Sequence, residues 1–314
     1  MGKGLVIRST GSWYSVKTDS GETIDCRVKG KLRMKGVRTT NPISVGDRVE
    51  FELQRDETTK EGVTGIISAI ETRRNYIIRK ATNLSKESQI IAANIDTAYL
   101  VVTVNYPVTL PGFIDRYLVS ARAYRIPACL IFNKLDIYTK GDYEKLEEFL
   151  QTYESIGYKC YQVSALKNFN IDSLSEDMKG KINLFSGLSG VGKSSILNCL
   201  EPSLKLKTEL ISDYHQQGKH TTTFAEMFEL KDGGYLIDTP GIRGFGVIDM
   251  VKEEISHYFP EIFALLKQCR YHNCTHTHEP GCAVKAALDE GRIPASRYES
   301  YLSLINDDDS RYRD

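Results

Sequence analysis

The stretch 187–194 constrains the fold of this chain more than any other. It reads GLSGVGKS and fits the pattern G-x-x-x-x-G-K-[ST]. The apolar run INLFSG precedes it and the helical run KSSILNCL follows it, as a strand–loop–helix unit requires. Its glycines let backbone N–H groups wrap an anion beside a helix N-terminus. The pattern therefore predicts a phosphate-binding loop, and a plain Gly-rich helix cap is the less specific alternative.

The chemistry of such loops assigns a role to each residue type. Lys193 would contact the β- and γ-phosphates, and the Ser194 hydroxyl would bind Mg²⁺. The predicted phosphate-binding residues are Gly187, Leu188, Ser189, Gly190, Val191, Gly192, Lys193, Ser194 and Ser195.

A second motif predicts which base accompanies the phosphates. The tetrapeptide NKLD follows the strand-like run CLIF, and its Asp136 can accept hydrogen bonds from guanine N1–H and the 2-amino group. Adenine would leave that carboxylate unpaired, which is costly in a buried site. Asn133 would brace the base-binding loops, the Lys134 stem would pack over the ring, and the backbone of SAL would offer a donor to guanine O6. The predicted base-binding residues are Asn133, Lys134, Leu135, Asp136, Ser164, Ala165 and Leu166.

Two further motifs complete a nucleotide site. Asp238 ends the run YLI and can hold Mg²⁺ through water, and the Gly241 N–H can meet the γ-phosphate. Between them and the phosphate loop lies QQGKHTTTF, in which Thr221, Thr222 or Thr223 can complete the Mg²⁺ shell. Each motif alone has an ordinary loop as its alternative. All four end strands of one α/β region, which predicts a guanine-nucleotide site.

The residue that orients the attacking water is less clearly marked. Ras-like enzymes place a Gln directly after the DxxG motif, whereas Ile242 stands there in this chain. His220, beside the three threonines, is the catalytic candidate that the sequence offers. An exposed loop histidine is an equally good interpretation of the sequence alone.

The rest of the chain divides around this region. A length of 314 residues suits two or three domains. Residues 1–72 hold five short strand-like runs separated by turn signals, which predicts a small all-β barrel of the OB kind. After a basic and polar connector over 73–92, strands alternate with helices to residue 248, which predicts a parallel sheet covered on both faces. Residues 249–314 read as a helical, Cys/His-rich domain.

Cysteine and histidine cluster near the C-terminus. Three of the seven cysteines and three of the six histidines fall within 269–282. An odd count clustered in this way argues against disulfides and for one metal site in a reducing compartment. A closed set of three thiolates and one imidazole suits structural zinc. His276 is the predicted imidazole ligand, and His278 or His272 could replace it. The predicted zinc ligands are Cys269, Cys274, His276 and Cys282.

Charge is distributed unevenly along a chain that is neutral overall. The first fifty residues hold ten Lys or Arg and five Asp or Glu. Within them, basic residues recur at every second position, which in a strand places them on one face. The stripe predicts RNA binding by the barrel, and a solvated strand face is the alternative. Its residues are Arg27, Lys29, Lys31, Arg33 and Lys35.

Membrane insertion and secretion find no support in the sequence. No stretch approaches the roughly 20 apolar residues of a spanning helix. The start MGKGLVIRSTGSWYS lacks the apolar core of a secretory signal. The chain is therefore expected to be cytoplasmic.

The order of the motifs adds a resemblance to known families. In translational GTPases the phosphate loop comes first, whereas here NKLD and SAL precede it and TTT and DTPG follow it. Together with the barrel and the Cys₃His segment, this permuted order resembles the small-ribosomal-subunit-dependent GTPase A family over essentially the whole chain. The family motif GRHTTT stands here as GKHTTT, with Lys219 for Arg, and Leu166 replaces the Lys of the usual SAK motif.

The resemblance implies a function. It implies a circularly permuted GTPase, with an OB-fold and a zinc domain, that binds the small ribosomal subunit late in its maturation and is stimulated by it. It favours His220 as a catalytic residue and Thr222 as the Mg²⁺ threonine. A GTP-gated RNA-binding module is the main rival, a permuted GTPase of the large subunit is a weaker one, and a monomer is expected.

Overall fold

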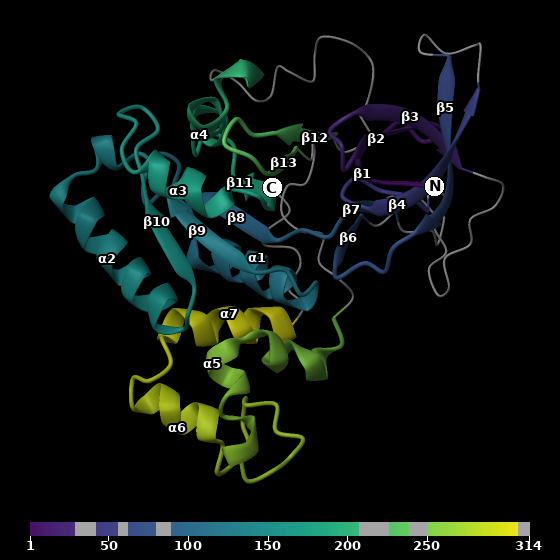
Figure 1. Cartoon of the computed structure of the whole chain (residues 1–314). Helices are drawn as coiled ribbons and strands as arrows, with labels where there is room; N and C mark the ends of the chain where they lie inside the picture. Colours follow the sequence, from purple (N-terminus) through teal and green to yellow (C-terminus); the bar gives the residue numbers. More distant parts are fainter. Residues whose placement is uncertain (29–41, 56–61, 80–88, 207–225, 239–249, 307–314) are drawn as a thin grey trace. The chain divides into compact units, whose positions relative to one another are not determined.

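The computed structural model describes residues 1–28, 42–55, 62–79, 89–206, 226–238 and 250–306 (Figure 1). The chain forms two compact units, each assembled from separate stretches of sequence. The first unit comprises Met1–Ala98, Ile171–Ser186 and Ser194–Gly246. The second comprises Tyr99–Asn170, Gly187–Lys193 and Val247–Asp314. Among the described residues, no helix has both the length and the apolar character needed to cross a bilayer.

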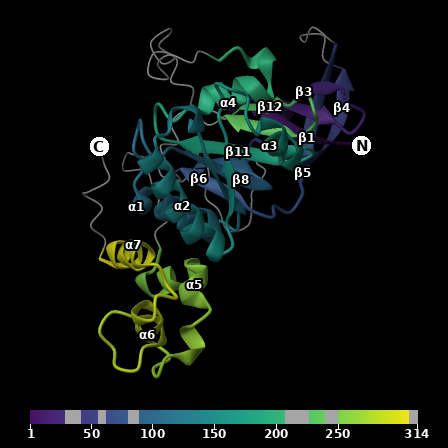
Figure 2. The same cartoon turned by 90° about the vertical axis from the view of Figure 1, so that its left-hand side faces the viewer.

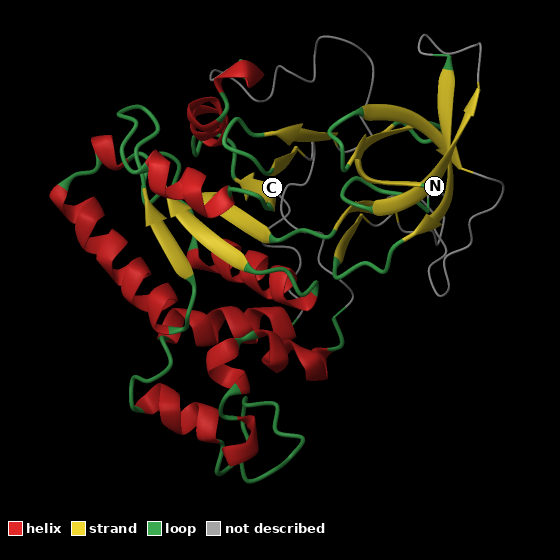
Figure 3. Ribbon diagram, viewed as in Figure 1, coloured by secondary structure: helices red, strands yellow, loops and turns green. Residues whose placement is uncertain are grey.

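The N-terminal strands of the first unit close into a barrel (Figure 3). They are β1 (Gly2–Ser9), β2 (Tyr14–Thr18), β3 (Thr23–Val28), β4 (Arg48–Arg55) and β5 (Val63–Ile70). The order β1-β2-β3-β5-β4 returns to β1, because β1 also pairs with β4. Only β3 and β5 run parallel among these neighbours.

Alternating apolar residues fill the barrel. Val6, Val16, Val49, Phe51 and Ile67 are almost completely buried there. Since successive side chains on a strand face opposite ways, this alternation is what a half-buried sheet requires. The predicted five-stranded OB-like barrel is confirmed.

The first unit also contains the strand that leads into the phosphate loop. In it β11 (Ile182–Gly187) runs parallel to β13 (Tyr235–Asp238), and β12 (Glu226–Glu229) lies antiparallel to β13. A single register pair, Arg8 with Glu226, joins β12 to β1. The described residues of this part also include α3 (Ile171–Met178), α4 (Lys193–Leu200), of which all but Lys193 lie in this unit, and the short η2 (Pro202–Leu204).

The connector expected over 73–92 is partly regular structure. Its described residues contain an antiparallel pair, β6 (Tyr76–Arg79) and β7 (Gln89–Ala93). Both strands are short and apolar, with Ile77 and Ile90 buried. The polar run between them in the sequence obscured this pairing.

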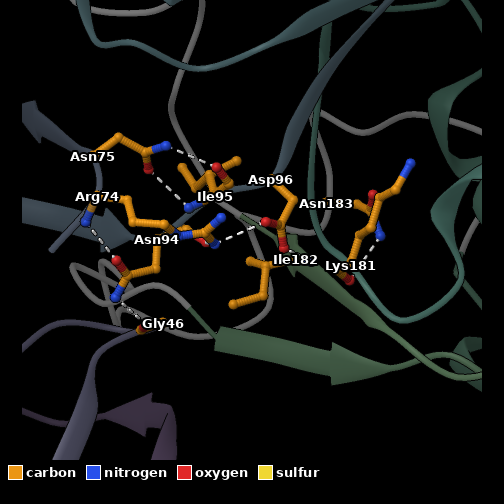
Figure 4. Close-up of polar contacts among 9 residues, drawn as sticks. All are labelled: Gly46, Arg74, Asn75, Asn94, Ile95, Asp96, Lys181, Ile182 and Asn183. Atoms are coloured by element: carbon orange, nitrogen blue, oxygen red, sulfur yellow. Dashed lines mark hydrogen bonds and ion pairs between the residues drawn. The ribbon is translucent and has the colours of Figure 1, made fainter. Parts of the chain in front are cut away.

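Hydrogen bonds tie the segment after β7 to both the barrel and β11 (Figure 4). The Asp96 carboxylate accepts from Arg74 at 2.7 Å and from the Ile182 backbone N–H at 2.8 Å. The Asn94 amide donates to the Gly46 carbonyl at 2.9 Å. The start of β11 is therefore fixed by a side chain outside its own sheet.

The second unit is built on a short buried sheet. Its strands are β8 (Thr97–Val102), most of which lies in this unit, β9 (Ala128–Phe132) and β10 (Lys159–Gln162), in the order β10-β9-β8. β9 and β10 run parallel, and every residue of β8 is buried. Such continuous apolar strands are typical of sheets covered on both faces. Helices α1 (Pro111–Ala123) and α2 (Lys140–Ser155) and the turn η1 (Leu135–Ile137) connect the strands.

The C-terminal segment of the second unit is helical, as the sequence predicts (Figures 1 and 2). It consists of η3 (Lys252–Tyr258), α5 (Pro260–Phe263), η4 (Leu266–Gln268), α6 (Ala283–Asp289) and α7 (Ala295–Ile305). Phe259, Ile262 and Tyr301 form its core together with Val119 of α1. The segment therefore shares one hydrophobic core with α1.

Candidate nucleotide and metal sites

The phosphate loop joins β11 to α4, and two of its glycines are required by space. Gly187 has φ +147°, and a Cβ there would lie 2.4 Å from the Val101 carbonyl oxygen. Gly192 has φ +94°, and a Cβ there would lie 2.3 Å from Asn133 Nδ2. Any larger residue would collide with its neighbours and adopt a disfavoured backbone conformation. The loop is therefore held tightly against the ends of β8 and β9.

The Lys193 side chain folds back over this loop. Its ammonium donates to the carbonyl of Gly187 at 2.7 Å and to that of Leu188 at 2.6 Å. A positive charge is thus kept at the loop, where an anion would bind.

Asn133 connects three of the predicted motifs. It follows β9 and is 1% exposed. Its Nδ2 donates to the carbonyl of Val191 in the phosphate loop at 2.9 Å, and its Oδ1 accepts from the Ala165 N–H at 3.1 Å. The phosphate loop, NKLD and SAL therefore meet through one buried amide. The Ala165 N–H is also the donor that the sequence assigns to guanine O6.

The other NKLD side chains point to the same edge of the sheet. Lys134 has φ +68°, and its ammonium donates to the Tyr106 carbonyl at 2.7 Å. The Asp136 carboxylate accepts from the Ser164 hydroxyl, while Leu166 is 79% exposed. The segments that follow β9 and β10 thus carry the Asp136 carboxylate, the Lys134 stem and the exposed Leu166 side chain.

The four predicted metal ligands form one cluster. Their ligand atoms in Cys269, Cys274, His276 and Cys282 all lie within 4.8 Å of one another. His276 Nδ1 is 3.6 Å from Cys269 Sγ and 3.5 Å from Cys282 Sγ. A tetrahedral zinc with bonds of about 2.3 Å to sulfur and about 2.0 Å to nitrogen would separate these atoms by about 3.5 Å. The donor set therefore fits a tetrahedral metal, bound through His276 Nδ1.

Comparison with known proteins decides the family. The sequence profile described as RsgA GTPase matches residues 70–248, and that of the RsgA N-terminal domain matches residues 3–63. The small ribosomal subunit biogenesis GTPase RsgA of Bacteroides fragilis is 54% identical, over 99% of both chains. The chain belongs to the RsgA GTPase family. The relative of the same name from Flavobacterium johnsoniae is 52% identical, over 99% of this chain and 94% of that one.

Solved structures agree with this membership. YjeQ from Thermotoga maritima has a TM-score of 0.79 at 36% identity, covering 97% of each chain. YloQ, described as a circularly permuted GTPase, has a TM-score of 0.76 at 27% identity, covering 99% of this chain and 96% of that one. Like YloQ, this RsgA GTPase is circularly permuted, with NKLD and SAL before the phosphate loop.

The other site residues that the sequence predicts for this RsgA GTPase are either in regular elements or outside the described residues. Ser194 and Ser195 continue α4 directly after the loop, and Asp238 is the last residue of β13. The remaining predicted residues fall outside the described parts of the chain: His220, Thr222, Gly241, Lys29, Lys31, Arg33 and Lys35. Arg27 is described, at the end of β3, with its guanidinium carbon 3.8 Å from the centre of the Trp13 ring.

The loop between β8 and α1 lies at the candidate site, and the sequence motifs did not indicate it. Its Tyr106 carbonyl holds Lys134, and its Pro107 is the neighbour that a Cβ at Gly190 would meet, at 3.6 Å. The signal that could have found it is positional. Loops at the carboxyl ends of parallel strands line ligand sites, and this loop follows the buried run TAYLVVTV.

Hydrogen bonds to Glu279 hold together the loop of residues 269–282, which carries the predicted metal ligands of this RsgA GTPase. Burial raises the pKa of Glu279, but hydrogen bonds from Thr275 and neighbouring backbone outweigh it and hold the pKa well below its usual range. Its carboxylate accepts from the N–H groups of Thr275 and Thr277 at 2.7 and 3.0 Å. Burial lowers the pKa of His276, which favours the neutral ring that metal ligation requires.

The same loop distinguishes between the candidate histidines. His276 is 1% exposed and adopts φ +59°, which turns its ring toward the cysteines. His278 Nδ1 instead contacts the Thr277 hydroxyl at 2.8 Å. The geometry therefore favours His276 over His278 as the fourth ligand.

Proposed function

We propose that this chain hydrolyses GTP to GDP and phosphate, as a hydrolase of the EC 3.6.1 class, during maturation of the small ribosomal subunit. The observation that carries the proposal is the Asn133 amide, which joins the phosphate loop to NKLD and SAL. Only a ligand with both a phosphate tail and a base would use these motifs together. The role in subunit maturation is supported by the relatives from Bacteroides fragilis and Flavobacterium johnsoniae, which are named small ribosomal subunit biogenesis GTPases.

The residues divide into phosphate, metal and base contacts. Lys193 neutralises charge on the β- and γ-phosphates, and the Gly241 N–H meets the γ-phosphate. Mg²⁺ would be held by Ser194, Thr222 and Asp238, and would neutralise charge on the phosphates. The Asp136 carboxylate reads guanine, while the Ala165 N–H is shared between guanine O6 and Asn133 Oδ1. His220 orients the attacking water.

The partner is an RNA-rich particle. We assign its binding to residues 1–72, through the stripe that begins at Arg27, and the GTPase and zinc-binding domains to residues 73–248 and 249–314. The protein acts as a cytoplasmic monomer. Subunit binding stimulates turnover through His220 and Thr222.

The base assignment is tested by Asp136→Asn. An amide cannot accept from both guanine donors, so GTP affinity should fall at least about 100-fold, since hydrogen bonds to charged groups contribute roughly 1.5–3 kcal/mol each. The same amide suits the 2-oxo group of xanthine, so xanthosine triphosphate should bind better than GTP. Titration with both nucleotides measures this preference.

The control is Asp289→Asn, since Asp289 is an exposed residue at the end of α6. It should bind GTP as the wild type does. An Asp136→Asn protein that keeps its preference for guanine would show that another group reads the base.

The metal assignment is tested by metal analysis of the purified protein. We expect one zinc per chain, lost in Cys269→Ser or Cys282→Ser because three ligands leave an open, weaker site. Cys199→Ser, in α4 and outside the cluster, should keep the metal. Wild-type protein that contains no zinc when prepared without chelator would rule the site out.

A further inference from the structure

A buried group of charges joins the C-terminal segment to α1. Arg297 of α7 is 0% exposed. Its Nη1 donates to Asp115 Oδ1 of α1 at 2.6 Å, and its Nε donates to Glu261 Oε1 of α5 at 2.7 Å. The Tyr153 hydroxyl of α2 also donates to Asp115, at 2.9 Å. Four helices therefore meet around one guanidinium.

Stabilising the contact between these helices does not by itself explain a buried group of charges. Well-packed apolar residues often stabilise a protein as much as a buried ion pair does, because desolvating charges is costly. A guanidinium fork, however, fixes the direction as well as the distance of its partners. The Phe259 ring, centred 4.6 Å from the guanidinium carbon, restricts Arg297 further. The arrangement sets the position of α7 relative to α1.

Two tyrosines of α7 that follow Arg297 hydrogen-bond to the loop of residues 269–282, which carries the four predicted metal ligands. The Tyr298 hydroxyl donates to the carbonyl of His276 at 2.6 Å, and the Tyr301 hydroxyl donates to that of Thr275 at 2.8 Å. One short helix thus binds the backbone of the metal-binding residues and, through Arg297, a carboxylate of α1.

The other end of this connection is the nucleotide site. Helix α1 begins at Pro111, four residues before Asp115, directly after the loop whose Tyr106 carbonyl binds Lys134. A Cβ at Gly190 would lie 3.6 Å from Pro107 of the same loop. Within that loop Thr103 Oγ1 donates to the Pro107 carbonyl at 2.6 Å, which keeps it compact. A shift of α1 would therefore move the carbonyl that positions the Lys134 side chain.

We propose that Arg297 is a positioning residue for nucleotide binding. By holding Asp115 it keeps α1 and the loop before it against Lys134 and the phosphate loop, so the metal-bearing segment supports retention of the guanine nucleotide. This rests on the proposed assignment of the nucleotide site to NKLD and the phosphate loop. The effect acts through protein contacts, since Arg297 itself is buried among four helices.

The test is titration of the full-length protein with a fluorescent GDP analogue in the presence of Mg²⁺. Arg297→Met should weaken GDP binding about fivefold to tenfold, in the lower range of coupling between separate sites. Its metal content should stay equal to that of the wild type. Arg292→Met is the matched control, because Arg292 is exposed and pairs only at the surface with Glu290. It should bind GDP normally.

A double-mutant cycle separates positioning from general loosening. Asp115→Asn keeps the shape of the side chain and should weaken GDP binding to a similar degree, which also provides a test if Arg297→Met does not fold. The double variant should bind no more weakly than Arg297→Met alone, because both changes break one link. The proposal is wrong if the losses of GDP affinity in the two single variants multiply in the double variant. It is also wrong if Arg297→Met and Asp115→Asn both bind GDP with wild-type affinity.

Two further variants distinguish this failure from failure of the nucleotide site. Lys193→Ala and Asp136→Asn are measured in the same titration. If they lose affinity while the Arg297 and Asp115 variants do not, only the positioning role is wrong. If they bind GDP normally, the nucleotide site itself is wrong.

Discussion

Replacing Lys193 with alanine should lower the turnover number for GTP by at least about 100-fold, as expected for removing one preorganised charge from a developing transition state. The ammonium is held at the phosphate loop by the carbonyls of Gly187 and Leu188. It is thus placed to stabilise the charge that builds on the transferred phosphoryl group. Phosphate release under saturating GTP and Mg²⁺ measures the effect.

The variant should remain folded, because the hydrogen bonds from Lys193 to Gly187 and Leu188 lie within its own loop. Circular dichroism and zinc content report the fold. Lys179→Ala, an exposed lysine after α3, should have wild-type turnover. Undiminished turnover in Lys193→Ala would place the phosphates somewhere other than this loop.

His220→Ala should remove most of the rate that the small ribosomal subunit induces. Ile242 stands where Ras-like enzymes place glutamine, so the free protein lacks that water-orienting group and should turn over slowly. Stimulation of a GTPase by a partner reaches about 10⁵-fold in the Ras case, so the loss can be large. Turnover of the variant with saturating subunits measures it.

Binding must be separated from catalysis in this variant. His220→Ala should keep wild-type affinity for GTP and for the subunit, because its proposed role is limited to the water. His257→Ala, at the end of η3, is the matched histidine control and should be stimulated normally. A His220→Ala protein stimulated as strongly as the wild type would exclude this histidine as the water-orienting group.

Local patterns predict much of this fold. The phosphate loop, NKLD and SAL follow buried strands, and a parallel sheet brings such strand ends to one edge. Alternation in the first seventy residues predicts the barrel, since one face of each strand is buried. Clustering of Cys and His within fourteen residues predicts the metal ligands, because their spacing is short enough for one loop to collect them.

Contacts between distant residues could not be predicted in this way. Asp115 and Arg297 are separated by 182 residues, and each alone resembles an ordinary surface charge on a helix. The Tyr106 carbonyl leaves no trace in the sequence, because any residue supplies a carbonyl. The sequence indicated His276 as the fourth ligand but left His278 and His272 as alternatives, because spacing alone does not show which ring faces the cysteines; in the structure the His276 ring does so.

We expect this RsgA GTPase to hydrolyse GTP under control of the small ribosomal subunit. The most direct measurement compares GTP turnover by the wild-type protein alone, with purified small subunits, and with purified large subunits. We expect slow turnover alone and with large subunits, and turnover raised at least about tenfold by small subunits, well within the range known for partner-stimulated GTPases. Equal rates in all three conditions would contradict control by the small subunit and favour a GTP-gated RNA-binding module.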